Sequence, residues 1–321
     1  ARESAGAIEF LEKAGVDLGD VTLCGGHSLA RTHRIPSTTD GMPQPVGFGI
    51  VTALKKKIES IQKKDPSRIK ILLNSRVLGL ISWNDSTITG VIVRGPDGKS
   101  SEDQWQTVVL TTGGFSADKC DNSSLLAEFA GAELRLPTTN GPFARGDGVK
   151  MARHIGAKLI GMNRVQVHPT AFVDPADPGA FTKFLAAEAL RGKGALLLSS
   201  KGVRFANELD RRDYVTARIQ QECAPLPATF HGGSAGQPAA LLVMNDRAID
   251  DFGRPAFNFY AVTKKFFVKY ANAVAFAAAL GIDAAVKKTY AHYLQRVCGQ
   301  DGVKAACERC VQQDDISRCF Q

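Results

Sequence analysis

The sequence predicts an α/β fold in its first half and an α+β fold in its second half. Helical and strand-like periodicities alternate through the first half, which is typical of α/β proteins. Near Met162 the composition changes to glycine-rich loops and then to helices. A chain of 321 residues is long enough for two domains, and we assign residues 1–162 to the first and residues 163–321 to the second.

The elements of the first domain follow from hydrophobic periodicity. Helical spacing of apolar residues predicts helices over 1–14, with Gly15 as a stop, and over 49–64. Strands are predicted over 69–73, 77–83, 90–94 and 107–111, the last one short and buried. The turn at 95–98 makes a hairpin after the third of these strands.

The second half of the chain reads mainly as helices. A helix over 146–156 is followed by a segment, 158–167, that leaves the first domain. Further helices are predicted over 215–223, 257–280 and 284–311, and a strand over 239–245. Asp213 is the expected N-cap of the first of these helices.

Charged residues concentrate in one stretch of the second domain, residues 166–213. It contains the segments 166–170 (QVHPT), 186–192 (AAEALRG) and 204–213 (RFANELDRRD). These segments are otherwise apolar and glycine-rich, so they should be partly buried, where an unpaired charge is costly. A small dianionic substrate could provide the partner that these ionised groups need.

Further motifs connect this stretch to a known family. They are 25–28 (GGHS) with 31–34 (RTHR), 73–77 (LNSRV), 112–115 (TGGF), and 138–140 (TTN) with 146–148 (GDG). Together, and in this order over about the first 250 residues, they resemble the soluble, single-chain FAD-dependent fumarate reductases. The family's opening G-x-G-x-x-G turn has no counterpart here, and nothing after Gly281 resembles its closing glycine-rich segment. The resemblance therefore implies an incomplete Rossmann-like FAD-binding domain, followed by an α+β capping domain with a helical C-terminal tail.

The resemblance also implies roles for individual residues. Arg212 aligns with the family's proton donor, and Glu188 and Arg191 align with the relay that reprotonates it. An arginine, with an ordinary pKa above ~12, acts as an acid only if a relay returns its proton and nearby cations lower its pKa. Glu188 and Arg191 are three residues apart and share one helix face, which suits a relay but also suits an ordinary helix pair.

Substrate binding is expected from His168, Glu188 and Arg212. His168 precedes a proline, so its backbone should be extended. Ala187 stands where some relatives carry a hydroxyl residue. Arg211 is a second candidate for the acid, and the family spacing favours Arg212.

The cofactor implied by the resemblance is FAD. The glycines after the strand-like segment 107–111 allow close approach of the backbone to a dinucleotide. The candidate FAD-binding residues are Val77, Thr112, Gly113, Gly114, Asn140 and Asp147. His27 lacks the context of the covalent flavin histidine of membrane-bound relatives, so we expect non-covalent FAD.

Composition and charge restrict the remaining classes of function. A hydrophobic fraction of 44% and no apolar run of the roughly 20 residues that span a bilayer indicate a globular protein without a membrane span. The net charge of +8 has two interpretations: a solvated basic surface, or a positive cleft that attracts a dicarboxylate. The lysines at 55–57 and 63–64 lack interleaved aromatic residues, which argues against nucleic-acid binding.

Seven cysteines are present, four of them near the C-terminus. The terminal four are Cys298, Cys307, Cys310 and Cys319. Their gaps are long for a compact zinc knuckle, so we expect free thiols and no metal site.

Two hypotheses remain open at the level of the sequence. The first is a fumarate reductase that takes electrons from NADH or reduced flavin through a module outside this chain, with a mitochondrial or glycosomal location by resemblance. L-aspartate oxidase and ketosteroid dehydrogenase are its alternatives within the fold. The second hypothesis is a catalytically incomplete fragment that binds no FAD.

Overall fold

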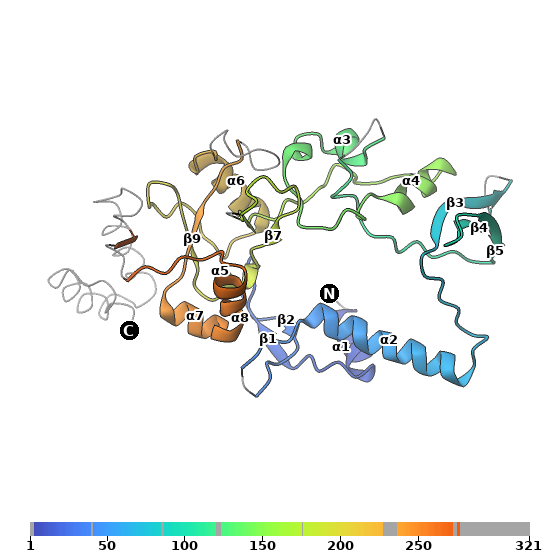
Figure 1. The fold of residues 1–321 in the computed structure, drawn as a ribbon, viewed down its shortest axis with the longest axis horizontal. Coiled ribbons are helices and arrows are strands. Elements are labelled where there is room, and N and C mark those ends of the chain that lie inside the picture. The colour runs from blue at the N-terminus through green and yellow to red at the C-terminus, as the bar shows by residue number, and fades with distance from the viewer. Residues whose placement is uncertain are drawn as a thin grey trace. The chain divides into compact units, whose positions relative to one another are not determined.

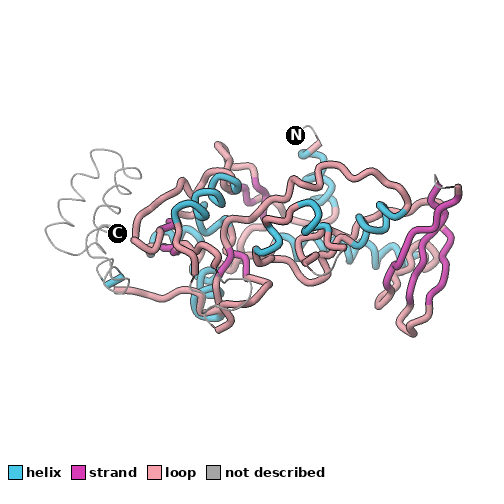
Figure 2. The backbone as a smooth tube through the Cα atoms, turned by 90° about the horizontal axis from the view of Figure 1, so that it is seen from above, coloured by secondary structure: helices cyan, strands magenta, loops and turns pink. Residues whose placement is uncertain are grey.

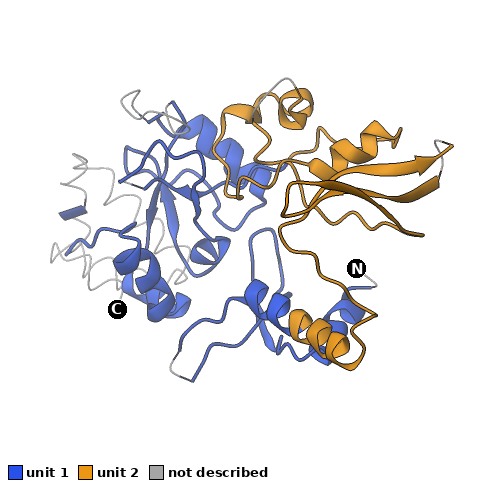
Figure 3. Cartoon of the chain, turned by 45° about the vertical axis from the view of Figure 1, so that its right-hand side comes forward, with its two compact units in different colours: residues 1–53, 166–321 blue, residues 54–165 orange. Residues whose placement is uncertain are grey.

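The computed structural model describes residues 3–39, 41–84, 87–119, 123–174, 176–226, 236–271 and 275–276. The chain forms two compact units, which Figure 3 colours separately. Unit 1 contains residues 1–53 and 166–321, and unit 2 contains residues 54–165. Both units combine helices with small antiparallel sheets, so the chain is the mixed helix and sheet protein that the sequence predicts (Figure 1).

The N-terminal part of unit 1 begins with a helix and a short hairpin. Helix α1 (Ser4–Lys13) is followed by strand β1 (Asp20–Thr22), which pairs antiparallel with β2 (Thr32–Arg34). Arg34 Nη2 lies 2.9 Å from Asp20 Oδ2 across this pair. The connection between the two strands contains the loop Cys24–His27, which reaches the candidate site.

The second part of unit 1 is built around one buried strand. Strand β8 (Leu196–Leu198) is buried at all three positions and pairs antiparallel with β9 (Leu241–Val243). Helix α6 (Arg212–Glu222) packs its apolar face against this strand. The core cluster consists of Leu197, Phe205, Ala206, Val215, Ile219 and Cys223.

Smaller elements complete unit 1. Strands β6 (Ala171–Phe172) and β7 (Phe184–Leu185) form a two-stranded ladder, and α5 (Glu188–Gly192) follows directly. After β9 come α7 (Asp246–Phe252), α8 (Arg254–Asn258) and a single π-helical turn, η3 (Phe259–Thr263).

Unit 2 contains the one larger sheet within the described residues. Strands β3 (Arg76–Trp83), β4 (Thr87–Arg94) and β5 (Ser100–Gln104) form an antiparallel sheet in that order. Figure 2 shows the strands of this sheet in magenta. Helices α3 (Leu125–Phe129) and α4 (Asp147–His154) and a 3₁₀ turn, η1 (Glu133–Arg135), follow. Helix α2 (Val46–Lys64) contributes residues to both units. No helix of the described ranges is long and apolar enough to cross a membrane.

Several predicted elements are confirmed, with shifted ends. The hairpin, the helices at 1–14, 49–64 and 146–156 and the strand at 77–83 all form. The predicted strand at 239–245 shortens to β9, and the predicted helix at 215–223 begins three residues earlier, as α6.

Two predicted strands do not form. Residues 69–73 and 107–111 are irregular, and Leu73 and Val109 are 75% and 76% exposed. A strand needs a neighbour to satisfy its backbone groups, and no described strand pairs with either segment. Apolar runs alone therefore gave the wrong prediction here.

The predicted helix at 257–280 is also wrong in its described part. Helix α8 ends at Asn258, the π-helical turn η3 follows, and residues 265–270 are irregular. Aromatic side chains hold this irregular segment: Phe172 stacks on Phe266 with ring centroids 4.6 Å apart. The predicted helix at 284–311 lies outside the described residues.

Candidate active site

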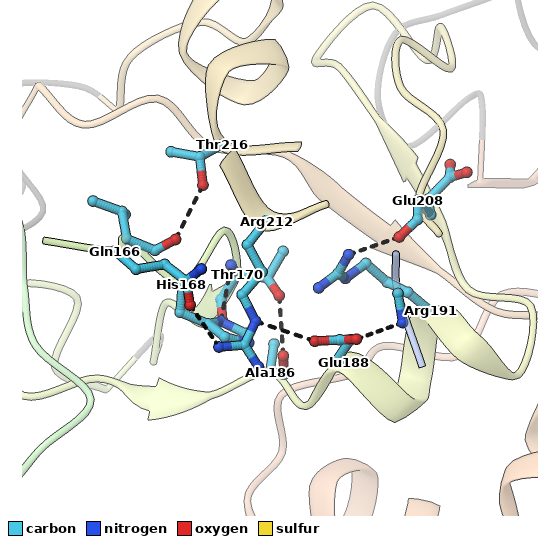
Figure 4. A network of polar contacts seen from close by, with 11 residues as sticks. Gln166, His168, Thr170, Ala186, Glu188, Arg191, Glu208, Arg212 and Thr216 are labelled. Atoms are coloured by element: carbon cyan, nitrogen blue, oxygen red, sulfur yellow. Dashed lines mark hydrogen bonds and ion pairs between the residues drawn. The ribbon is translucent and has the colours of Figure 1, made fainter. Parts of the chain in front are cut away.

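Arg212 is the first residue of α6, and two acceptors from other segments fix its side chain. Its Nε donates to Glu188 Oε2 at 3.2 Å, and its Nη1 donates to Gln166 Oε1 at 3.0 Å (Figure 4). The side chain stays 45% exposed, so it is both oriented and open to a ligand. The guanidinium therefore points toward Glu188, with which the sequence associates it, and toward Gln166.

The start of α6 differs from the prediction. Arg211, and not Asp213, occupies the N-cap position, with an extended backbone and no side-chain cap. Asp213 lies in the first turn, where a carboxylate is favourable next to the helix N-terminus. Its Oδ2 pairs with Arg211 Nη2 at 3.1 Å, and both side chains are well exposed.

Glu188 is the first residue of α5, and each of its carboxylate oxygens has one partner. Oε2 accepts from Arg212, and Oε1 accepts from the backbone N–H of Gly25. A Cβ at Gly25 would lie 2.9 Å from Glu188 Oε1 and 3.2 Å from the Asp210 carbonyl oxygen. A side chain at position 25 would thus displace Glu188, which explains the glycine.

Arg191 lies one turn beyond Glu188 and is only 3% exposed. Its Nη1 donates to the Glu208 carbonyl oxygen at 2.7 Å, while Nε and Nη2 have no hydrogen-bond partner among the described residues. Burial lowers the pKa of Arg191, and the nearby Arg212 lowers it further, whereas Glu188 and Glu208 oppose this shift. A buried guanidinium with free donors and a lowered pKa is suited to exchange protons with a neighbour.

His168 has its ring next to the backbone of Thr170. Its Nδ1 lies 2.9 Å from the Thr170 carbonyl oxygen and 3.3 Å from the Thr170 nitrogen. The pKa of His168 is lowered, first by burial and then by Arg212 and Arg191, while the Thr170 contact and Glu188 oppose this. The ring is therefore neutral near pH 7, and the shorter contact, in which Nδ1 donates to the Thr170 carbonyl oxygen, favours the tautomer that leaves Nε2 as an acceptor.

The β6–β7 ladder brings His168 and Glu188 into one region. Ala171 pairs with Leu185, and Thr170 Oγ1 donates to the Ala186 carbonyl oxygen at 3.0 Å. His168 precedes one strand and Glu188 follows the other, so the ladder fixes both backbones. In Figure 4, Arg212 lies between His168 on one side and Arg191 on the other. Ala187 is the N-cap residue of α5 and provides no side-chain cap.

Two contacts of this site were not anticipated from the sequence. Sequence reasoning assigned no role to Gln166 or to the Gly25 amide. Gln166 lies two residues before His168, and in an extended segment such residues face the same side. That spacing is a signal for Gln166, whereas the Gly25 contact spans 163 residues and has no local signal.

The candidate cofactor residues lie in unit 2, where the segment 146–148 contacts both the segment 112–114 and Arg76. The Gly148 N–H donates to Thr112 Oγ1 at 3.1 Å, and the Gly146 N–H donates to the Gly114 carbonyl oxygen at 3.0 Å. Asp147 lies between these glycines, and its Oδ2 is 3.5 Å from Nη2 of Arg76, the residue that precedes Val77 in β3. Asn140 is held by a different contact, from its N–H to Thr138 Oγ1 at 3.1 Å.

The glycine turn of unit 2 has room for a close ligand. Gly113 has φ = +79°, a conformation that favours glycine, and no atom lies within 4 Å of a Cβ built at Gly113 or at Gly114. This open backbone fits the close approach of a dinucleotide. Within the described ranges, no group of three or more His, Cys, Asp or Glu side chains is placed to hold a metal ion. The four C-terminal cysteines lie outside those ranges.

Comparison with known proteins places the chain in a family of FAD-dependent oxidoreductases. The chain belongs to the FAD binding domain family, whose model matches residues 1–302, and its cofactor is FAD. It is similar to the fumarate reductase of Schizosaccharomyces pombe, with 41% identity over 243 residues, 75% of this chain and 46% of that protein. Fumarate reductase 1 of Saccharomyces cerevisiae is 39% identical over 253 residues, 78% of this chain and 50% of that protein.

A solved structure gives the same result. The open conformation of a flavocytochrome c3 fumarate reductase matches 92% of this chain and 46% of its own, with a TM-score of 0.62 and 26% identity. The predicted fold class, oxidoreductase family and FAD cofactor are thereby confirmed. The chain spans about half the length of the relatives it matches.

Proposed function

We propose that this chain carries the substrate site of an FAD-dependent fumarate reductase that converts fumarate to succinate. Bound FAD, held non-covalently, would supply a hydride from N5 to one alkene carbon. Arg212 donates the proton to the neighbouring carbon. The observation that carries the proposal is the fixed but open Arg212 guanidinium, bonded to Glu188 and Gln166.

The charges around Arg212 suit a dicarboxylate. Arg191 and Arg212 provide donors, His168 interacts electrostatically with both, and Glu188 contacts Arg212 at 3.2 Å. Charge-assisted hydrogen bonds from arginine orient a carboxylate plane, and they stabilise the negative charge that develops as hydride adds to the alkene. Thus His168, Glu188 and Arg212 form the proposed substrate-binding set.

The proton consumed at Arg212 must be replaced. Glu188 contacts Arg212 directly, and Arg191 interacts electrostatically with both residues. Arg191, with its lowered pKa and its free Nε and Nη2, is the next group of the relay. In this proposal a proton passes from Arg191 to Glu188 and then to Arg212.

The cofactor-binding set proposed for unit 2 contains Val77, Asn140, Asp147 and the turn Thr112–Gly114. The backbone at Gly113 and Gly114 would contact the dinucleotide, and Asp147 would accept a hydrogen bond from it. Electrons would come from NADH or reduced flavin through a separate module, and the partners would be fumarate and succinate.

The experiment compares the two adjacent arginines in the FAD-loaded chain. Arg212→Ala and Arg212→Lys should lower fumarate-dependent oxidation of reduced viologen by at least about 100-fold, the usual range for loss of a general acid. The content of bound flavin, measured by its absorbance, should be unchanged, because Arg212 is not among the proposed flavin-binding residues.

Arg211→Ala is the matched control, since Arg211 is the preceding residue and its side chain is 73% exposed. A larger loss with Arg211→Ala than with Arg212→Ala would refute the assignment of the acid. A wild-type chain that stays colourless in the presence of FAD would favour the incomplete fragment instead. Turnover with L-aspartate but not with succinate or fumarate would favour an L-aspartate oxidase.

A further inference from the structure

One buried ion pair in unit 2 has no part in the proposed chemistry. Asp118 is 1% exposed, and its Oδ1 accepts from Lys150 Nζ at 2.8 Å. Its Oδ2 accepts from the Leu125 N–H, at the start of α3, at 2.7 Å. The carbonyl oxygen of Asp118 accepts from the Ser124 hydroxyl. One residue thus connects α3, α4 and the segment that follows the glycine turn.

This ion pair closes a row of contacts between two segments. The segment 112–118 contacts the segment 144–150 through Thr112 with Gly148, Gly114 with Gly146, and Ala117 with Ala144. The N–H of Ala117 donates to the Ala144 carbonyl oxygen at 2.9 Å. The Asp118–Lys150 pair adds a fourth contact, and it is the one in the row that joins two charged side chains.

The same two segments carry most of the proposed cofactor residues. Thr112–Gly114 lies on one segment and Asp147 on the other. Removing one charge of a buried pair is costly, because it leaves the other charge without a partner between the two segments. We propose that Asp118, through Lys150, is a positioning residue that holds the glycine turn against the start of α4 in the geometry that binds FAD. This inference rests on the proposed cofactor site.

A second ion pair of α4 provides the control. Arg153 of α4 pairs with Glu128 of α3 at 2.6 Å, with side chains 50% and 43% exposed. It shares helix α4 and the charge types, but it lies at the surface and outside the row of contacts. An exposed pair contributes little to stability, so Glu128→Gln should leave the contacts between the segments 112–118 and 144–150 unchanged.

The first measurement needs no cofactor. Amide hydrogen exchange at Gly146 and Gly148 reports directly on the contacts with Gly114 and Thr112. Asp118→Asn keeps an acceptor for the Leu125 N–H but leaves Lys150 without its charged partner. Exchange at both glycines should accelerate about tenfold in Asp118→Asn, while Glu128→Gln should match the wild type.

The second measurement is FAD binding by quenching of flavin fluorescence. Asp118→Asn and Lys150→Gln should each raise the Kd for FAD about tenfold, and Lys150→Arg should restore binding because it keeps the charge. If Asp118→Asn does not fold, Lys150→Gln and Lys150→Arg decide the question, since Lys150 is partly exposed and can be replaced more easily.

Three results would overturn the inference: unchanged exchange at both glycines, faster exchange with an unchanged Kd, or equal effects from Glu128→Gln. A wild-type chain that binds no FAD would refute the cofactor site, and the inference would fall with it. That result is read from the wild type alone, so the two failures are distinguishable.

Discussion

Arg211 and Arg212 are neighbours in the chain but have different partners. Arg211 has the extended backbone of an N-cap and pairs with Asp213 at the surface. Arg212 is the first helical residue, and its side chain turns toward Glu188 and Gln166. A change of backbone conformation between adjacent residues thus sends two identical side chains to different environments. The family spacing favoured Arg212, but its contacts depend on tertiary packing.

The titration of His168 gives a prediction at the residue scale. Its pKa is lowered mainly by burial, so the unfolded chain takes up this proton at a higher pH than the folded chain. The contribution to stability is therefore complete above the ordinary value of about 6.5, and it is lost as pH falls toward the lower folded pKa.

Urea unfolding between about pH 7.5 and about pH 5 measures this effect. The free energy of unfolding of the wild type should decline more steeply toward acid pH than that of His168→Gln, because the variant cannot take up the proton. Parallel pH profiles for the two proteins would contradict the assigned burial of the ring.

At the scale of elements, Glu208 connects β8 to the segment that leads into α6. Its side chain is 4% exposed, and its carboxylate accepts from the Leu197 N–H at 3.0 Å and from Arg204 Nε at 3.1 Å. Its carbonyl oxygen also accepts from Arg191. Glu208 therefore supports both the core strand and the segment that ends at Arg212.

Glu208→Ala should lower the free energy of unfolding by about 3 kcal/mol, because the Leu197 N–H loses its acceptor and a buried ion pair is broken. Glu222→Ala is the control: the Arg218–Glu222 pair has the same spacing in the sequence, but its side chains are 34% and 43% exposed. The control should change the free energy by less than about 0.5 kcal/mol in the same urea titration. Equal losses would show that burial of Glu208 is not the source of its effect.

The helices at 1–14, 49–64 and 146–156 and the hairpin were predicted well because their signals are local. The period of α2 and the Gly-Pro-Asp-Gly turn before β5 depend on residues close in sequence. The strands expected at 69–73 and 107–111 depended on distant neighbours, and the described strands provide none. The helix expected beyond Asn258 was overridden by aromatic contacts to Phe172 and Phe184.

At the scale of the whole molecule, the net charge of +8 bears on the proposed dianionic substrate. A positive molecule attracts a dianion over a distance set by the ionic strength, and the Debye length falls from about 30 Å at 0.01 M to about 8 Å at 0.15 M salt.

The KM for fumarate should therefore rise several-fold over the range from about 0.01 to about 0.15 M sodium chloride, with little change in kcat. Steady-state assays of the FAD-loaded chain at fixed pH measure both constants. A fall in kcat at constant KM would show that salt acts on the chemical step or on the fold, and not on attraction of the substrate.

The sequence by itself determined the family, the cofactor class and the helices with strong periodicity, and it predicted a substrate site at His168, Glu188 and Arg212. These follow from residue types and short spacings, which can be recognised without knowledge of the packing. Only the tertiary structure decided the burial of Arg191, the contact of the Gly25 amide with Glu188, and the row of contacts closed by Asp118 and Lys150. Such contacts join residues between 27 and 163 positions apart, and no local pattern specifies them.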